Sequence, residues 1–337
     1  MNVKKTAVYP KMVLDRAGYL LGISMVYIII WSVTLMGYRK ALAVGEKIGD
    51  ALYFLFSRMR AKVLHNLKFA FGEEISQKDR DETARKVLKN FGKDWVELFF
   101  AAGPSKNVLG EQIIIEGKEN LDKALSQDRG VIAVSAHIGN YPLIGTKLAK
   151  EGYNFMMVIR DLKTRAGSAV YKKARELIEL PSIATVPEKQ FFKSALNLLK
   201  DNGILCLISD ENKRYGGIFV DFFGHPASTA PGPAALTVRT GAPVVPVFIM
   251  RNDDNSQRII IEKEIEWEQT GDTTRDMKEI TSGFTKVIED YVRMDPSQWV
   301  WTNWRWRTQP WGKSSKAKIK KKKRLEALKK ILRKIGQ

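Results

Sequence analysis

Histidine is rare in this sequence, and one of its three histidines stands where chemistry is expected. The three are His65, His137 and His225. His137 comes two positions after the apolar run 131–135, which has the composition of a buried strand. Ligands of open α/β sheets bind at the carboxyl ends of strands, and an imidazole there can act as a general base near neutral pH. A lone histidine in a turn is more often structural, so the neighbouring sequence must support the catalytic interpretation.

The two residues Gly139 and Asn140 follow His137 closely and suit a tight backbone turn. A helix predicted over residues 143–150 would then present N–H groups at its N-terminus to an oxyanion or a phosphate. We therefore expect Gly139 and Asn140 to contribute to substrate binding.

A second polar segment follows another predicted strand. Asp210 comes directly after the apolar run 204–208 and Ser209, so it can share a sheet edge with His137. The aromatic residues beyond it need an apolar surface or an acyl chain to cover them, which a solvated surface hairpin would not provide. Four residues of this segment, which we expect to form an ordered loop, are candidate substrate-binding residues: Phe222, Phe223, Gly224 and Thr229.

Arg160 stands at a third predicted strand end, after the run 155–159. Its guanidinium would suit a phosphate group at this edge of the sheet. An ordinary loop arginine is an equally good interpretation.

Short β-rich runs alternate with helical segments over most of the chain. The runs are apolar enough to be buried on both faces, which predicts an α/β fold with a mixed, largely buried β-sheet flanked by helices. The predicted strands are 112–115, 131–135, 155–159, 204–208, 244–249 and 258–264. The predicted helices are 44–71, 76–101, 143–150, 168–180, 191–200, 231–239 and 272–293.

The N-terminal segment predicts a membrane helix. Between Arg16 and Arg39 lie 22 uncharged residues. As a helix they would extend about 33 Å, against about 30 Å for a hydrocarbon core. A cleaved signal peptide is the alternative, but Arg39 and Lys40 directly after the apolar run argue against cleavage. We assign residues 1–40 to a membrane anchor, and basic residues on both sides of the span leave its orientation weakly defined.

The net charge of +19 is concentrated at the C-terminus. Residues 313–337 contain twelve Lys and Arg against one Glu, with apolar residues every three or four positions from Leu325 to Ile335. This pattern predicts a basic amphipathic tail on an anionic membrane surface. A solvated, partly disordered tail explains it nearly as well.

Several functional classes lose support. The single cysteine, Cys206, lies in an apolar run and is expected to be a buried small hydrophobe. The sequence contains no Gly-x-Ser-x-Gly elbow, Walker A loop, Gly-x-Gly-x-x-Gly or metal-spaced histidine pair, so we expect no cofactor and no metal. Tryptophans between residues 299 and 306 could stack on nucleic acid, but beside a membrane span they suit a membrane interface better, and we expect no nucleic-acid partner.

Four segments together resemble the bacterial lipid A biosynthesis (late) acyltransferases: 137–141, 216–224, 232–248, and 298–301 before 305–307. The resemblance covers nearly the whole chain and implies an acyltransferase domain over residues 41–312, with a fold like that of glycerol-3-phosphate acyltransferases. It implies transfer of a fatty acyl group from an acyl carrier protein or acyl-CoA thioester to a hydroxyl of a glycolipid such as a lipid A precursor. The location that it implies is the bacterial inner membrane, and the basic tail favours a catalytic domain on the cytoplasmic side.

The family motif is a histidine base followed, after four residues, by an Asp or Glu that holds its tautomer. His137 matches the first position, but Pro142 occupies the second and its side chain cannot accept a hydrogen bond. Asp210 is the first candidate to replace the acid, with Asp161, Glu211 or a main-chain carbonyl as alternatives. We expect one of these acceptors within hydrogen-bond reach of a His137 ring nitrogen. A non-catalytic lipid-binding paralogue is the alternative function.

Overall fold

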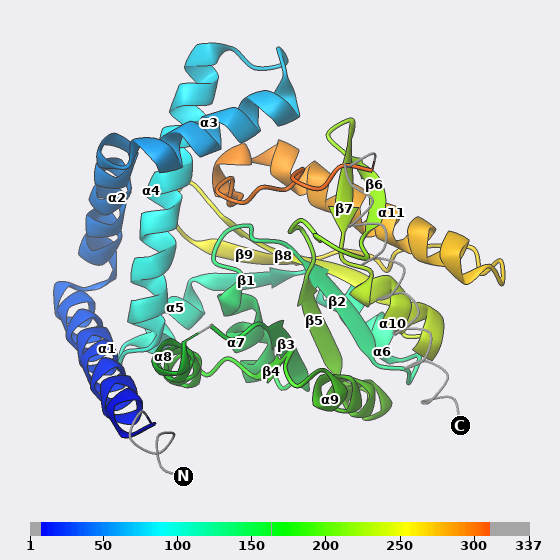
Figure 1. Ribbon diagram of the computed structural model, residues 1–337, viewed down its shortest axis with the longest axis horizontal. Helices are drawn as coiled ribbons and strands as arrows, with labels where there is room; N and C mark the ends of the chain where they lie inside the picture. The colour runs from blue at the N-terminus through cyan, green and yellow to red at the C-terminus, as the bar shows by residue number, and fades with distance from the viewer. Residues whose placement is uncertain (1–7, 163, 311–337) are drawn as a thin grey trace, which may run out of the picture.

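The computed structural model describes residues 8–162 and 164–310, and within them a seven-stranded sheet has the order β1-β9-β8-β2-β5-β3-β4 (Figure 1). The strands of the sheet are β1 Ile113–Glu116, β2 Val131–Ser135, β3 Phe155–Ile159, β4 Ser182–Ala184, β5 Ile204–Ile208, β8 Val244–Arg251 and β9 Gln257–Ile261. A separate antiparallel hairpin consists of β6 Ile218–Phe222 and β7 His225–Thr229. The predicted α/β fold is confirmed.

The direction of the strands decides which ends meet. Strands β8, β2, β5, β3 and β4 run parallel to one another, whereas β9 pairs with β8 in the antiparallel direction. The carboxyl ends of β2, β5 and β3 therefore lie along one edge of the sheet. All five residues of β2 are buried, as its apolar composition predicts for a strand covered on both faces.

Alternate residues of β2 pack into different cores. Ile132 and Val134 face a core that also contains buried residues of α3 (Ser57–Phe71), α10 (Gly232–Thr240) and α11 (Thr273–Met294). Val131 and Ala133 face a second core, which contains residues of α4 (Gln77–Ala101) and α7 (Pro142–Lys150). This period of two is the strand geometry itself. The sheet is thus the layer between two sets of helices.

The helices are α1 Val8–Met36, α2 Tyr38–Leu55, α3 Ser57–Phe71, α4 Gln77–Ala101, α5 Lys106–Glu111, α6 Lys118–Leu125, α7 Pro142–Lys150, α8 Arg165–Leu177, α9 Glu188–Lys200, α10 Gly232–Thr240 and α11 Thr273–Met294. A 3₁₀ turn follows at Pro296–Gln298. The prediction of one helix over 44–71 is wrong, because Phe56, with φ −105° and ψ 73°, separates α2 from α3. A one-residue interruption barely changes the apolar spacing, so periodicity could not reveal it. The ordered loop predicted after Asp210 is also wrong in part, since its second half forms the β6–β7 hairpin.

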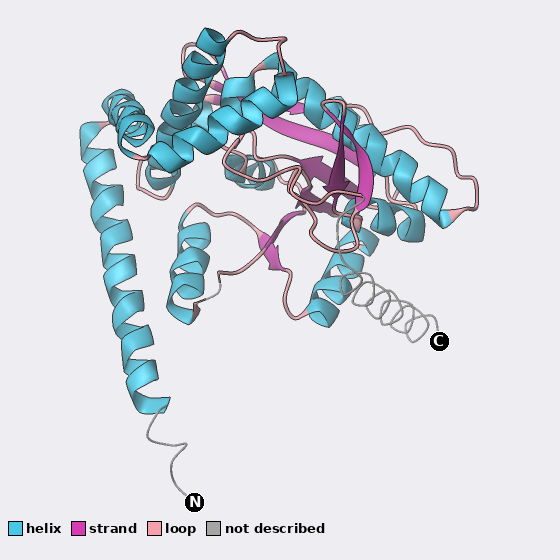
Figure 2. Cartoon of the chain, turned by 45° about the horizontal axis from the view of Figure 1, so that its top comes forward, coloured by secondary structure: helices cyan, strands magenta, loops and turns pink. Residues whose placement is uncertain are grey.

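Helix α1 contains the predicted membrane span. Among the described residues, Arg16–Met36 is the one stretch long and apolar enough to cross a bilayer, and 11% of its most apolar window is buried in the protein. Figure 2 shows this helix, next to the N-terminus, at the edge of the molecule and extending beyond it. Leu21 and Leu35 are 74% and 80% exposed, so the helix carries an apolar surface that the other described residues do not cover.

Helices α2 and α4 cross with their backbones in contact. A Cβ atom on Gly92 of α4 would lie 2.1 Å from the carbonyl oxygen of Gly45, and one on Gly49 would lie 2.2 Å from the carbonyl oxygen of Leu88. Glycine is therefore required at this crossing. It fixes α4, which carries residues that contact the site described below.

Cys206 of β5 is fully buried, as its apolar neighbours predict. Burial raises the pKa of its thiol to about 12, which keeps it protonated and unreactive near neutral pH. The predicted basic tail, residues 313–337, lies outside the described residues.

Candidate active site

Two adjacent parallel strands bring His137 and Asp210 to the same place. Ser135 at the end of β2 is in register with Ile208 at the end of β5. His137 and Asp210 each follow two residues after these strand ends. Sequence positions 73 apart therefore meet at one edge of the sheet, as the strand-end argument predicts.

The His137 ring is hydrogen-bonded to a buried carboxylate. Its Nδ1 lies 2.8 Å from Oδ1 of Asp210, and its backbone N–H donates to Oδ2 of the same residue at 3.0 Å. The Asp210 side chain is 1% exposed, whereas the His137 side chain keeps 21% of its surface exposed. The predicted acceptor for a His137 ring nitrogen is present, and it is Asp210.

Trp299 gives Asp210 a further donor, which sequence reasoning missed. Its indole Nε1–H donates to Oδ2 of Asp210 at 2.7 Å. The interpretation of this tryptophan as a membrane-interface residue is wrong, because it is 2% exposed. The same correction applies to Trp301 and Trp306, whereas Trp304 is 47% exposed. The indole N–H of Trp299 needs an acceptor once it is buried, and the carboxylate supplies one.

The backbone around Trp299 is paired with the backbone around His137. Gly139 N–H donates to the carbonyl of Gln298 at 2.9 Å, and Val300 N–H donates to the carbonyl of His137 at 3.0 Å. Ile138 and Trp299 form an isolated antiparallel bridge. Residues 298–307, the C-terminal segment, thus contact both members of the His137–Asp210 pair. They bond His137 through the main chain and Asp210 through the indole of Trp299.

Gly139 is needed for its conformation and its lack of a side chain. Its φ is 52°, and a Cβ there would lie 2.5 Å from the carbonyl oxygen of Ile249 in β8. Its N–H is engaged by Gln298 and so does not serve a substrate oxyanion in this arrangement. The geometry gives Gly139 a packing role beside the base.

Asn140 is buried, and its amide faces α4. Nδ2 donates to the carbonyl of Asp94 at 3.1 Å and to Oε2 of Glu97 at 3.0 Å. The Glu97 side chain is fully buried and also accepts hydrogen bonds from Arg251 of β8 and Gln257 of β9. Asn140 therefore ties the turn after His137 to a buried ionic network that the sequence patterns did not reveal.

The Glu97 network also constrains the C-terminal segment. Arg251 bonds Asp94 and Glu97 at 2.5 Å, and burial raises the pKa of Asp94 to about 6 even though Arg251 opposes that rise. The backbone N–H of Arg251 donates to Oε1 of Gln298 at 2.7 Å, and Nε2 of Gln298 donates to the carbonyl of Arg251 at 2.9 Å. Buried charges of this kind must keep all their partners, so the network holds the elements around the site in one arrangement.

The four residues predicted to bind substrate after Asp210 lie in the β6–β7 hairpin. Phe223 and Gly224 form its two-residue turn, with φ of 58° and 69°. Phe222 and Phe223 are 0% and 4% exposed, and their rings contact Trp299, Trp301 and Trp306. Phe222 therefore packs directly against Trp299, Phe223 packs against Trp301 and Trp306, and an acyl chain of the substrate has no open access to either ring.

Thr229 is also enclosed. Its Oγ1 accepts a hydrogen bond from Nη2 of Arg305 at 2.6 Å, and both residues are at most 1% exposed. Burial lowers the pKa of Arg305 to about 10, with Asp210 opposing the shift. Thr229 thus belongs to the support of the C-terminal segment.

The other candidate acids bond elsewhere. Asp161 lies 3.5 Å from Nη2 of Arg175, and Glu211 accepts a hydrogen bond from Asn303 at 3.1 Å. Pro142 occupies the first turn of α7, where its missing N–H costs nothing and its fixed φ suits the helix. Arg160 is exposed beyond β3, at the same edge of the sheet as His137.

Comparison with known proteins agrees with this arrangement. The family described as bacterial lipid A biosynthesis acyltransferase matches residues 13–308. The chain belongs to this family. Its enzymes are acyltransferases, and so is this protein.

Curated relatives of this acyltransferase fall into two groups by name. The phosphatidylinositol mannoside acyltransferase of Mycolicibacterium smegmatis is 27% identical over 274 residues, which cover 78% of this chain and 86% of the relative. The lipid A biosynthesis palmitoleoyltransferase of Escherichia coli is 23% identical over 290 residues, covering 85% and 91%. The lauroyltransferase of the same organism is 24% identical over 302 residues, covering 86% and 92%.

The electrostatics of the acyltransferase site favour a charged imidazole beside a charged carboxylate. Burial lowers the pKa of His137, but the charge of Asp210 and its hydrogen bond outweigh burial, and Glu211 adds to them, so the pKa is raised above 6.5. Burial raises the pKa of Asp210, but His137 and Trp299 outweigh it, so that pKa is lowered below 3.8. Within the described residues, no cluster of three or more His, Cys, Asp or Glu could hold a metal ion.

Substitution of Asp210 should therefore change the titration of His137. We expect the ring of His137 to titrate above 6.5 in the wild type and at a lower pH in Asp210→Asn, because the attracting charge is gone. Glu211→Gln should lower the pKa by less, since Glu211 contributes the least to the rise. Histidine ¹⁵N NMR across a pH series measures this, with His137→Gln to assign the signal. An unchanged pKa in Asp210→Asn would contradict the geometry.

Proposed function

We propose that this acyltransferase moves a fatty acyl group from a thioester to a hydroxyl of a glycolipid, with His137 as the general base and Asp210 as the residue that orients it. The observation that carries the proposal is the hydrogen bond between Nδ1 of His137 and the buried Asp210 carboxylate. This carboxylate also accepts a hydrogen bond from the indole N–H of Trp299. A partly exposed imidazole backed by a buried carboxylate is the arrangement that a hydroxyl-activating base requires.

The proton inventory follows from the hydrogen bonds. With Asp210 ionised, the neutral His137 ring carries its proton on Nδ1, which leaves the lone pair of Nε2 for the substrate. Nε2 takes the proton of the acceptor hydroxyl as its oxygen attacks the thioester carbonyl. The ester C–O bond forms, the C–S bond breaks, and the imidazolium returns the proton to the leaving thiolate. Asp210 stabilises the imidazolium between these steps.

The substrates are proposed by chemical class. The acceptor is a glycolipid, which the names of both groups of relatives support. The donor is an acyl carrier protein or an acyl-CoA thioester. Arg160, exposed after β3 at the same sheet edge as His137, could contact a phosphate of donor or acceptor.

The alternative of a non-catalytic lipid-binding paralogue has less support. Binding lipid does not require a buried carboxylate, which costs several kcal/mol to desolvate, behind a partly exposed histidine. The replacement of the motif acid by Pro142 removes one partner of the base, but Asp210 already occupies Nδ1 of His137.

Replacement of the base should abolish most of the activity. For His137→Ala we expect acyl transfer to fall by about 10² to 10⁴-fold, the usual contribution of a general base, without loss of the folded state. The assay mixes the purified full chain with an acyl carrier thioester and candidate glycolipids, and detects the acylated lipid by mass spectrometry. His65→Ala, at an exposed histidine outside the site, is the matched control. Equal transfer by His137→Ala and the wild type would overturn the proposal.

We also propose that α1 anchors the enzyme in the bacterial inner membrane, with the catalytic domain on the cytoplasmic side. The α2–α3 junction also exposes apolar side chains, with Phe54, Leu55 and Phe56 61%, 76% and 55% exposed. Nearby Arg58 and the basic tail would add attraction to anionic lipid.

Reporter fusions test this orientation. A fluorescent protein fused after Gln337 should fluoresce in bacterial cells, and alkaline phosphatase fused there should be inactive, because the former folds in the cytoplasm and the latter outside it. Membrane fractions should retain the full chain after an alkaline wash and release more of a variant that lacks residues 1–36. Active phosphatase with a dark fluorescent fusion would reverse the proposed orientation.

A further inference from the structure

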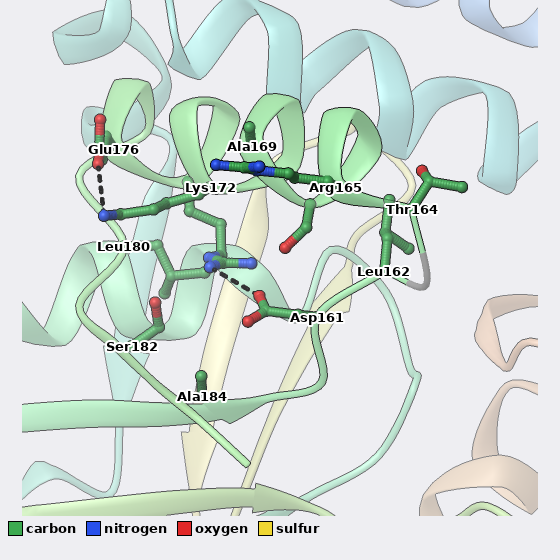
Figure 3. A pocket seen from close by; sticks show the side chains of 12 residues that line it. Asp161, Leu162, Thr164, Arg165, Ala169, Lys172, Glu176, Leu180, Ser182 and Ala184 are labelled. Carbon is green, nitrogen blue, oxygen red and sulfur yellow. Dashed lines mark ion pairs between the residues drawn. The ribbon is translucent and has the colours of Figure 1, made fainter. Parts of the chain in front are cut away.

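A large cavity lies at the same edge of the sheet as the candidate active site, and His137 is not among the residues that line it. Its volume is about 810 Å³, and it lies between α8, the segment after β3, and β4 (Figure 3). Figure 3 shows Asp161, Arg165 and Lys172 around this space. The resemblance and the proposed mechanism leave the cavity without a role.

Arg175 lines the cavity and has buried hydrogen-bond donors without acceptors among the described residues. The residue is 8% exposed, and its guanidinium lies 4.6 Å from the ring centre of Tyr171. Nη2 is 3.5 Å from Asp161, but Nε and Nη1 are buried without a hydrogen-bond partner among the described residues. Buried donors without acceptors are costly, so an anion that lies near this guanidinium would be favoured. A phosphate has several oxygens that can accept hydrogen bonds from a planar guanidinium.

The other lining residues suit the sugar part of such a ligand. Arg165 and Lys172 add positive charge at the cavity wall, and the carboxylates of Asp161 and Glu176 can accept hydrogen bonds from sugar hydroxyls. Three hydroxyl side chains also line the cavity: Thr164, Ser168 and Ser182. Cations and carboxylates together fit a phosphorylated polyol better than a bare phosphate, which the carboxylates would repel.

The cavity lies between the membrane helix and the proposed base. On one side, α1 packs against α8, where Gly22 lies so close that a Cβ would be 2.9 Å from Val170. On the other side, Tyr171, beside the Arg175 guanidinium, and Tyr141 pack against the same apolar core, and the ring centre of Tyr141 is 4.9 Å from that of His137. A headgroup in the cavity would therefore belong to a lipid near α1 and lie next to the base.

We propose that this cavity binds the phosphate-bearing sugar headgroup of the acceptor, with the phosphate beside the Arg175 guanidinium and close to Arg165 and Lys172. The assignment to the acceptor rests on the proposed function, whereas the binding of a sugar phosphate does not. A phosphate could also arrive as the prosthetic group of the donor. The probes below distinguish these sources.

The experiment measures binding to the full chain in detergent by calorimetry. The probes are glucose 1-phosphate, glucose, inorganic phosphate and 4′-phosphopantetheine. We expect the wild type to bind glucose 1-phosphate more tightly than the other three, and Arg175→Gln to weaken that binding by about tenfold or more. Arg129→Gln, at an exposed arginine before β2 on the opposite edge of the sheet, is the matched control and should bind as the wild type does.

Further variants keep the test decisive if Arg175→Gln fails to fold. Lys172→Gln changes a side chain that is 72% exposed, so it should fold and weaken binding by about twofold to fivefold. His137→Ala should bind glucose 1-phosphate as the wild type does while it loses acyl transfer, which separates this proposal from the proposed function. Undiminished binding in the folded Arg175 and Lys172 variants would overturn the site. Preference for 4′-phosphopantetheine would overturn its assignment to the acceptor.

Discussion

The buried Asp210 carboxylate is the constraint on which the rest of the site depends. A carboxylate that is almost completely buried costs several kcal/mol to desolvate unless donors surround it. Here the ring and backbone of His137 and the indole of Trp299 donate to it. Each donor requires a particular piece of the fold: the adjacency of β2 and β5 for His137, and the pairing of the backbone at 298–300 with the turn after β2 for Trp299. The charge that tunes the base thus also determines where the C-terminal segment lies.

The replacement of the motif acid by Pro142 is consistent with this arrangement. A partner five positions after His137 would come from the first turn of α7, whereas Asp210 comes from the end of a neighbouring strand. Since Nδ1 of His137 is already engaged, position 142 is free to start the helix, for which proline is well suited. Because His137 and Asp210 both follow strands of the sheet, rigid elements orient the base. The hydrogen bond from Asn140 to Glu97 also fixes the turn after His137.

The sequence was most informative where runs are wholly apolar. The strands 131–135, 155–159 and 204–208 were predicted residue for residue, and the strand-end argument then brought His137 and Asp210 together. Trp299 could not be found in this way, because its bond to Asp210 joins positions 89 apart and has no local pattern. Aromatic residues occur both in protein cores and at membrane surfaces. Composition alone therefore predicted a membrane-interface position for Trp299 and acyl-chain binding for Phe222, whereas both side chains are buried. Buried polar networks such as that of Glu97 likewise leave no periodic trace.

The dependence of kcat/KM on pH in Asp210→Asn tests the central claim most directly. The base is active when neutral, so the rate of the wild type should fall as the pH drops below the raised pKa of His137. In Asp210→Asn that acid limb should move to lower pH, and the plateau should fall by about 10² to 10⁴-fold because the ring loses its orienting acceptor. An acid limb and a plateau that both match the wild type would contradict the account.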